Sequence, residues 1–215
     1  MSDAPALHPL AAILDAAADG RFPPVDGACE VLPPDVGGLR AVVAFTGHAY
    51  VLADVDPAEL AKHGADGYGG ASRPHVLQWL AGAGGHVGST DAVLVAEATP
   101  GPSLPRRADV ADHPRVRRAA GYRIDLAVYG DEVGLVVLGR GLAGRWELSV
   151  ELLDAAASGQ GHGRRLIRAG LAALELGERC WAQVAPGNAA SLRAFLACGF
   201  TPIGSEVLIT AAGRP

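Results

Sequence analysis

The stretch Trp146–Arg165, WELSVELLDAAASGQGHGRR, decides the fold of this chain. Residues Trp146 to Leu153 alternate apolar and polar side chains, which is the pattern of a half-buried β-strand. A segment of small residues follows, and from Arg164 the apolar residues recur at the spacing of an α-helix. We therefore predict a strand, a glycine-rich loop and a helix, in this order.

The glycines of this loop lie where the predicted helix begins. Gly159, Gly161 and Gly163 allow sharp turns and a close approach of a ligand to the main chain. The first N–H groups of a helix have no partner inside the helix, and the helix dipole adds partial positive charge there. Such an end suits a phosphate-bearing cofactor, with Arg164 and Arg165 beside it. The glycines alone leave a second interpretation open, a flexible connection that binds nothing.

Length and composition restrict the function classes. The chain has 215 residues and a net charge of −5, enough for one domain or two small ones. An acidic chain has no overall basic field for nucleic acid or an anionic membrane. We see no signal-peptide pattern and no apolar segment of spanning length, so we expect a cytoplasmic protein without nucleic-acid or membrane partners. The cysteines lie far apart in sequence and form no metal-binding motif, so we expect no metal.

The rest of the chain predicts a mixed α/β protein in two parts. Residues 1–90 form an N-terminal α+β part without a chemical motif, which offers a surface for a homodimer contact. Residues 91–215 form the second part. Helices are predicted at 9–18, 72–80, 112–120 and 189–198, besides a short one that begins at 56–57 and the one that begins near 164. Strands are predicted at 29–32, 39–55 with a turn at 46–48, 91–98, 123–128, 133–140, 146–153, 179–184 and 200–210.

Two motifs carry a family resemblance. The first is SGQGHG at 158–163, which matches the pyrophosphate loop R/Q-x-x-G-x-G/A. The second is NAASLRAFLACGF at 188–200, an asparagine followed by a helix and a closing Gly-Phe. Together they resemble the GNAT superfamily of acyl-CoA-dependent N-acetyltransferases, over about residues 91–210. The resemblance implies a GNAT-like mixed, mostly antiparallel sheet flanked by helices, here with an N-terminal α+β extension.

The resemblance implies a reaction and a coenzyme site. Acetyl-CoA would be the cosubstrate, and a primary amine of a small molecule or protein would be the acceptor. Main-chain N–H groups at Leu152 or Leu153 would stabilise the oxyanion. The coenzyme contacts that the resemblance implies are Leu152, Leu153, Ser158, Gly159, Gln160, Gly161, His162, Gly163, Arg164, Arg165, Asn188, Ser191 and Phe195.

The catalytic base of the family often lies on the strand before the loop. Glu147 and Glu151 share one face of this strand, and we take Glu151 as the first candidate and Glu147 as the second. The alternative is a solvated strand face on which both carboxylates only confer solubility.

Two positions depart from the family pattern. Ser158 replaces the usual Arg or Gln, and Phe195 replaces a tyrosine that acts as general acid in many members. These departures leave open a non-catalytic acyl-CoA-binding module that serves as a sensor or a structural protein. A dinucleotide-binding loop is disfavoured because Arg164 occupies the position of its third glycine, and the Walker motif is absent from the sequence.

Overall fold

The computed structural model describes residues 8–154 and 159–212, which fall into two compact units. Unit 1 comprises Met1–Ala92 with Ile203–Pro215, and unit 2 comprises Val93–Pro202. The predicted α/β class with a mixed, mostly antiparallel sheet is confirmed. Strand pairs β2–β3, β2–β9, β5–β6 and β6–β7 are antiparallel, whereas β1–β3 and β7–β8 are parallel.

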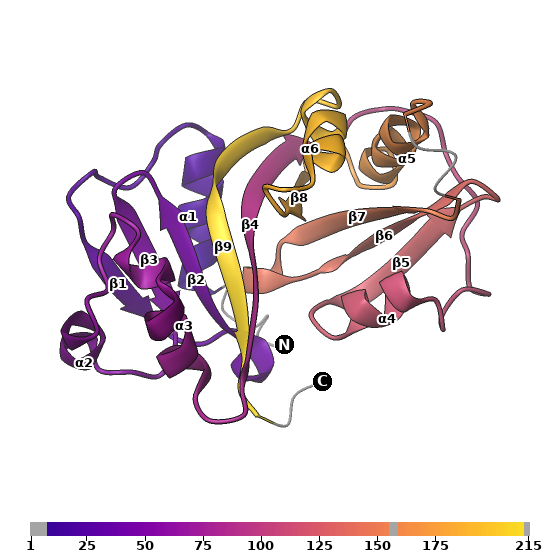
Figure 1. Cartoon of the computed structure of the whole chain (residues 1–215). Helices are drawn as coiled ribbons and strands as arrows, with labels where there is room; N and C mark the ends of the chain where they lie inside the picture. The colour runs from indigo at the N-terminus through magenta and orange to yellow at the C-terminus, as the bar shows by residue number, and fades with distance from the viewer. Residues whose placement is uncertain (1–7, 155–158, 213–215) are drawn as a thin grey trace, which may run out of the picture. The chain divides into compact units, whose positions relative to one another are not determined.

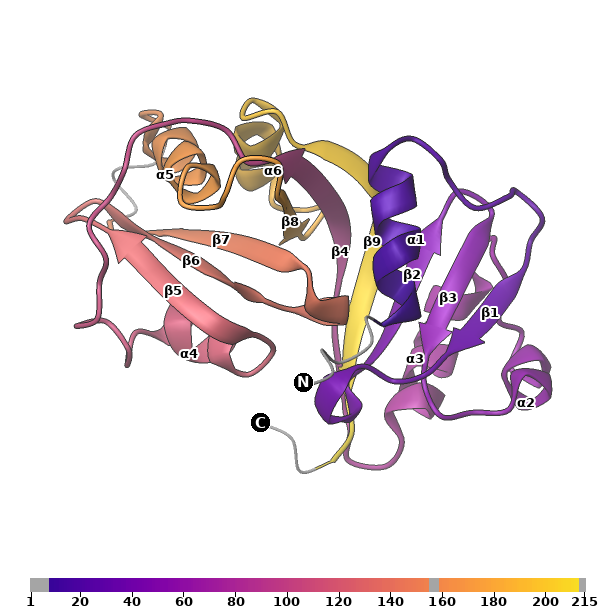
Figure 2. The same ribbon diagram turned by 180° about the vertical axis from the view of Figure 1, so that it is seen from behind.

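Unit 1 is a sheet with helices on both faces (Figures 1 and 2). Its strands lie in the order β1-β3-β2-β9-β4. They are β1 (Cys29–Leu32), β2 (Arg40–Phe45), β3 (His48–Leu52), β4 (His86–Glu97) and β9 (Thr201–Thr210). The helices are α1 (Pro9–Ala18) on one face and α2 (Pro57–Lys62) and α3 (Pro74–Ala81) on the other, with short 3-10 turns at Val36–Gly38 and Gly70–Ser72.

Local chemistry explains the helices of unit 1. Asp56 accepts a hydrogen bond from the Ala58 N–H and caps α2, as its place before Pro57 predicts. The apolar side of α3 packs Val76 and Leu80 into a core with strand residues such as Val42. The helix predicted at 9–18 is confirmed by α1.

Unit 2 contains the motifs of the sequence. Its strand order is β4-β8-β7-β6-β5. The strands besides β4 are β5 (Ile124–Gly130), β6 (Gly134–Arg140), β7 (Trp146–Leu152) and β8 (Arg179–Val184). The helices are α4 (Pro114–Ala120), α5 (His162–Leu171) and α6 (Ala189–Leu196), with a 3-10 turn at Leu142–Gly144. The predicted hairpin, strand, glycine loop and helix are therefore present in the predicted order.

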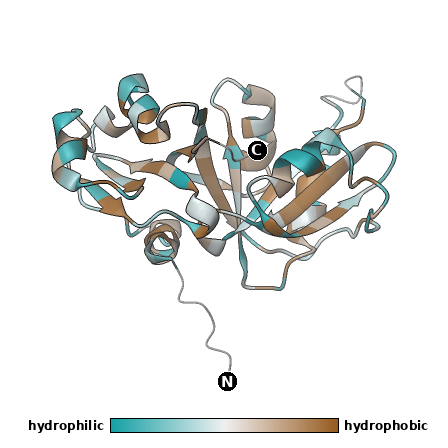
Figure 3. Cartoon of the chain, turned by 90° about the horizontal axis from the view of Figure 1, so that it is seen from below, coloured by the Kyte–Doolittle hydropathy of each residue, from teal (hydrophilic) through white to brown (hydrophobic). Residues whose placement is uncertain are grey.

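The helices α5 and α4 lie on opposite faces of this part of the sheet, α5 over β6 and β7 and α4 over β5 and β6 (Figures 1 and 2). On the α5 face, Gly170 approaches the sheet so closely that a Cβ atom would lie 2.3 Å from the Leu148 side chain. On the α4 face, Val116 and Ala119 pack with the strand residues Leu135 and Val137. In Figure 3 much of the brown, apolar colour lies on strands, whereas the helices carry teal, hydrophilic stretches. Even and odd residues of β7 therefore face different helices.

Two boundaries differ from the prediction. Ile203–Pro215 belongs to unit 1 and not to the second part, because β9 pairs with β2 from Ser205 to Ile209. Strand β4 begins at His86, earlier than the predicted start at 91. Glycine and polar residues hid its first half, where a Cβ atom on Gly88 would lie 2.9 Å from the Leu208 carbonyl oxygen. Among the helices of the described residues, none has the length and apolar character needed to cross a membrane.

Candidate functional site

Strands β7 and β8 part from each other in the middle of unit 2. They run parallel, and over their described residues they are in register at Trp146↔Cys180 and Glu147↔Trp181 alone. Beyond this point β7 continues to Leu152 and β8 to Val184. Because the register pairs end at Glu147↔Trp181 while both strands continue, their carboxyl-terminal halves part, and this part of β7 has an edge that β8 does not pair in the described residues.

The main chain of β7 offers hydrogen-bond donors along this edge. The Leu153 N–H donates to the Val133 carbonyl at 3.0 Å, on the β6 side. Since successive N–H groups of a strand point to opposite sides, those of Val150 and Leu152 point toward the diverging side. Of the two predicted oxyanion donors, Leu153 is therefore already engaged, and Leu152 has the suitable direction.

The glycine loop leads directly into α5. Gly159 and Gly161 have φ angles of 80° and 87°, which favour glycine, and Gly161 is the N-cap of the helix. Gly163 lies in the first turn with no positive φ, and a Cβ atom there would meet nothing within 4 Å. Neither the backbone conformation nor the packing of the described residues therefore requires glycine at this position. Ser158 lies outside the described residues.

The remaining loop residues are placed beside the helix start. Gln160 is exposed and His162 is half-buried at the first helical position. The helix therefore begins at His162, slightly before the predicted Arg164.

The arginines of α5 fall into two groups. Arg165 pairs with Asp131 at 2.7 Å and is therefore already neutralised. Burial acts to raise the pKa of Asp131, but hydrogen bonds from the Val133 N–H and Arg165 outweigh it, so this pKa is lowered.

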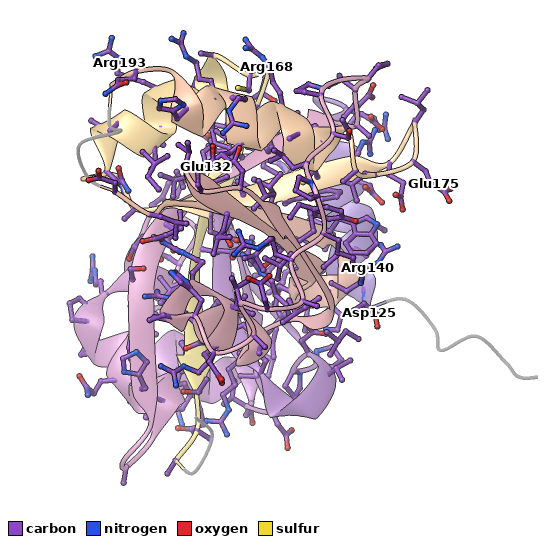
Figure 4. The ribbon with its side chains drawn as sticks, turned by 90° about the vertical axis from the view of Figure 1, so that its right-hand side faces the viewer. Asp125, Glu132, Arg140, Arg168, Glu175 and Arg193 are labelled. Atoms are coloured by element: carbon purple, nitrogen blue, oxygen red, sulfur yellow. The ribbon has the colours of Figure 1, made fainter. Side chains whose placement is uncertain are left out.

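The second group consists of exposed arginines. Arg164 is exposed. Arg168 of α5 and Arg193 of α6 are exposed as well and project from the same side of unit 2 (Figure 4). Of the two predicted phosphate contacts, Arg164 is therefore the more accessible, and Arg165 already has an acidic partner.

Glu147, the second candidate for the base, is the centre of a buried ion cluster. Its side chain is 3% exposed, and its two oxygens lie 2.8 Å from Arg123 Nε and 2.9 Å from Arg145 Nε. The Leu142 N–H adds a contact at 3.3 Å. Burial acts to raise the pKa of Glu147, but Arg145 and Arg123 outweigh it and lower the pKa. A buried carboxylate with a lowered pKa is a poor proton acceptor, so the geometry gives Glu147 a structural role.

Glu151, the first candidate, is more accessible. Its side chain is 36% exposed, and Oε2 accepts hydrogen bonds from Arg115 Nε at 2.8 Å and Nη2 at 2.5 Å. Both contacts use the same oxygen. Glu151 shares the α4 face of β7 with Glu147 and Ser149, as the alternation predicts.

The motif at 188–200 forms the predicted helix. The Asn188 side chain accepts a hydrogen bond from the Ser191 N–H at 3.1 Å, which confirms its role as N-cap. Phe195 is buried edge-on against Phe200, with ring centroids 4.9 Å apart. Its ring belongs to the core and carries no proton for a leaving thiolate.

Sequence reasoning missed four residues on the α4 face of the sheet. Arg115 and Arg123 pair with the two glutamates, and Arg123 also donates to Ser149 Oγ and Gln183 Oε1 at 3.2 and 3.3 Å. Trp181 and Gln183 come from β8. The alternation of RCWAQV could have placed the last two on one face, but no spacing indicates the arginines. Among the described residues, no group of three or more metal-ligating side chains lies together.

Comparison with known proteins gives matches among solved structures. No family model matches the chain, and no curated protein matches it. A GCN5-related N-acetyltransferase from Kribbella flavida is 18% identical at a TM-score of 0.39, over 59% of this chain and 60% of that one. A putative GNAT-family acetyltransferase from Novosphingobium aromaticivorans is 18% identical at a TM-score of 0.40, over 61% and 69%.

A third match is a GCN5-related N-acetyltransferase from Sphaerobacter thermophilus. It is 17% identical at a TM-score of 0.38, over 61% of this chain and 54% of that one. The match thus spans about three-fifths of the length of the Kribbella flavida protein. These proteins bear the name of the family that the two motifs resemble. At this level of similarity, the function has to rest on the site itself.

Proposed function

We propose that this chain is an N-acetyltransferase that moves an acetyl group from acetyl-CoA to a primary amine. The observation that carries the proposal is the divergence of β7 and β8 beside the glycine-lined start of α5. The pantetheine arm of coenzyme A contains amide groups, which can pair with a strand edge such as that of Val150 and Leu152. The pyrophosphate fits the first turn of α5, where N–H groups and Arg164 offer donors.

The residues of the site support the separate parts of acyl transfer. An alkyl amine has a pKa near ~10 and must lose a proton before it attacks the thioester carbon. Glu151, which is accessible at one end of β7, is the proposed base, acting directly or through water. The Leu152 N–H would stabilise the oxyanion. Because Phe195 carries no acidic proton, the thiolate would leave into water, which protonates it.

Thermal unfolding with ligands tests the coenzyme site. A ligand at 100 times its Kd adds ~2.7 kcal/mol to the stability of the folded state. We expect acetyl-CoA and CoA at this level to raise the Tm by roughly 5–10 °C, and ATP to leave it unchanged. The proposal fails if neither coenzyme raises the Tm. An equal rise with ATP would instead indicate a general nucleotide site.

Gly163 provides a test that separates binding from folding. A Gly163→Val substitution should leave the Tm within about 2 °C, since its Cβ meets nothing within 4 Å. It should weaken acetyl-CoA binding by more than about 30-fold, because the branched side chain fills the space of the pyrophosphate. Isothermal titration calorimetry measures the affinity. Gly163→Ala should stay within a few fold of wild type, and Gly187→Val applies the same change at another open glycine. Unchanged affinity of Gly163→Val would count against a phosphate at this helix.

A second candidate function is a non-catalytic acyl-CoA-binding module. It is favoured by the ion pairs that engage both carboxylates of β7 and by the buried phenyl ring of Phe195. This alternative predicts coenzyme binding without thioester turnover over a broad panel of amines. Any CoA release that depends on an amine and on Glu151 would reject it.

A further inference from the structure

Two buried hydrogen-bond donors lie on the α4 face of unit 2 without a protein partner in the described part of the chain. They are the indole N–H of Trp181 and the amide nitrogen of Gln183. Trp181 is 5% exposed. Both residues point to the same face of β8 because they are two positions apart, with Cα atoms separated by roughly 6.6 Å. Buried donors are rarely left unpaired in folded proteins, so this pair requires an explanation.

The amide of Gln183 has a defined orientation. Arg123 Nη2 donates to Gln183 Oε1 at 3.3 Å, which holds the oxygen toward the arginine. The amide NH₂ is therefore directed away from Arg123. Arg123, whose side chain is 10% exposed, is in turn fixed by Glu147 and Ser149. The oxygen of the amide is used and its nitrogen is available.

The chemistry of this face favours an anionic oxygen group. An indole N–H only donates, and the available part of the Gln183 amide also only donates. Three arginines and two glutamates line this face (Arg115, Arg123, Arg145, Glu147 and Glu151). A carboxylate, with two oxygens and about four lone-pair positions, matches two neighbouring donors.

The position of these donors relates them to the acceptor and not to the coenzyme. Trp181 forms the last register pair before β7 and β8 diverge. It shares its face with Glu147, because directly opposed residues of paired strands point the same way, and α5 packs on the other face. If the coenzyme phosphates bind at the start of α5, an amine reaches the thioester from the α4 face. The donors lie where the rest of that amine would be held.

We propose that the acceptor is an amine that carries a carboxylate, such as a free amino acid. The inference rests on the proposed acetyltransferase function. Trp181 and Gln183 bind the carboxylate, and Arg123 is a positioning residue that orients the Gln183 amide. The amine nitrogen attacks the thioester carbon, a C–N bond forms and the C–S bond breaks. One ammonium proton goes to the base and a second to water, the thiolate takes a proton from water, and the products are an N-acetylated amino acid and CoA.

Pairs of amines that differ only in the carboxylate test this inference. With acetyl-CoA as donor, CoA release is measured for tyrosine and tyramine, phenylalanine and phenethylamine, and lysine and cadaverine. A site built to bind a polar group rejects analogues without it strongly. We expect the carboxylated member to have a kcat/KM more than about 30-fold higher. Equal use of the decarboxylated amines overturns the inference, as does a preference for O-phosphoethanolamine over β-alanine.

Two conservative variants test whether the preference for carboxylated amines depends on the N–H donors of Trp181 and Gln183. Gln183→Glu replaces the amide nitrogen by an anionic oxygen, and Trp181→Phe removes the indole N–H but keeps a ring. Both should raise the KM for the carboxylated amine more than about tenfold and keep the Tm rise with CoA. Gln78→Glu and Trp79→Phe make the same changes in unit 1 and should preserve the preference. A preference that survives both site variants means that the donors bind buried water only, which overturns the inference.

Binding measurements distinguish a failure of the carboxylate-site inference from a failure of the proposed acetyltransferase function on which it rests. The absence of a Tm rise with either coenzyme rejects the proposed function itself. If coenzyme binds but no amine is acetylated, calorimetry with the CoA-saturated protein measures binding of the same pairs. Binding of a carboxylated amine that Gln183→Glu removes supports the carboxylate site. Binding of neither member overturns the inference, while the coenzyme site remains.

Discussion

A Glu147→Gln substitution is expected to lower the free energy of unfolding by about 3–5 kcal/mol, the range for breaking a buried ion pair. Glu147 is 3% exposed and lies between Arg123 and Arg145, so the amide would remove the negative charge that pairs with both of these buried guanidinium groups. For a chain of this size the Tm should fall by roughly 6–20 °C. Thermal and denaturant unfolding followed by circular dichroism measure the change.

An exposed ion pair provides the control for Glu147. Glu59 pairs with Lys62 on the surface of α2, where both side chains are more than half exposed. Glu59→Gln should therefore change the stability by less than about 1 kcal/mol. Similar losses for the two variants would show that the buried cluster adds nothing beyond an ordinary surface pair.

The effect of Glu147 should also depend on pH. Its pKa in the folded protein is lowered, because Arg145 and Arg123 outweigh the opposing effect of burial. A carboxyl group with a lowered pKa stabilises the folded state above its unfolded pKa of about 4.3, and this stability is lost as the pH falls through the folded pKa. The stability difference between wild type and Glu147→Gln should thus be complete at neutral pH and shrink in acid. A difference that grows in acid would contradict this assignment.

A Glu151→Gln substitution is expected to lower kcat by about 10²–10⁴-fold, the usual contribution of a general base. The amide keeps a hydrogen-bond acceptor for Arg115 but cannot take a proton from the amine. The KM for acetyl-CoA should remain within a few fold, because the proposed coenzyme contacts are on the main chain of β7 and at α5. Steady-state kinetics with the best amine of the panel measure both constants.

Glu132 provides the matched control for Glu151. It is an exposed glutamate in the turn between β5 and β6, labelled in Figure 4, and it has no role in the proposed mechanism. Glu132→Gln should retain the wild-type kcat. If Glu151→Gln retains it as well, the base is another group or a water chain. If wild type itself shows no turnover, the non-catalytic alternative gains support.

Elements with strong local signals could be predicted from the sequence. The helix at Pro9–Ala18, the caps Asp56 and Asn188, and the strand at Arg179–Val184 follow from periodicity and end chemistry within a few residues. These features are determined by residues that are close together in the sequence, so they can be recognised from the sequence alone.

The candidate site could be predicted only in part. The alternation of β7 places Glu147 and Glu151 on one face, but it contains no information about what covers that face. Their partners Arg123 and Arg115 lie 24 and 36 residues away, Arg123 just before β5 and Arg115 on α4. An ion pair between distant segments depends on packing and has no pattern of its own in the sequence. The distinction between a buried structural carboxylate and an accessible one therefore required the structure.

The pairing of β9 with β2 means that unit 1 is built from two segments that are not consecutive in the sequence. Unit 1 is completed by residues that follow unit 2 along the sequence. A gene fragment that stops at Ala92 would leave the backbone of Arg40–Ala44 without the neighbour that it has in the whole protein. Such an open edge promotes association between copies. During synthesis, the sheet of unit 1 can be completed only after β9, its last strand in the sequence, has been made. A protein in which unit 2 is exchanged must therefore keep both points where the chain passes between the units, after Ala92 and before Ile203.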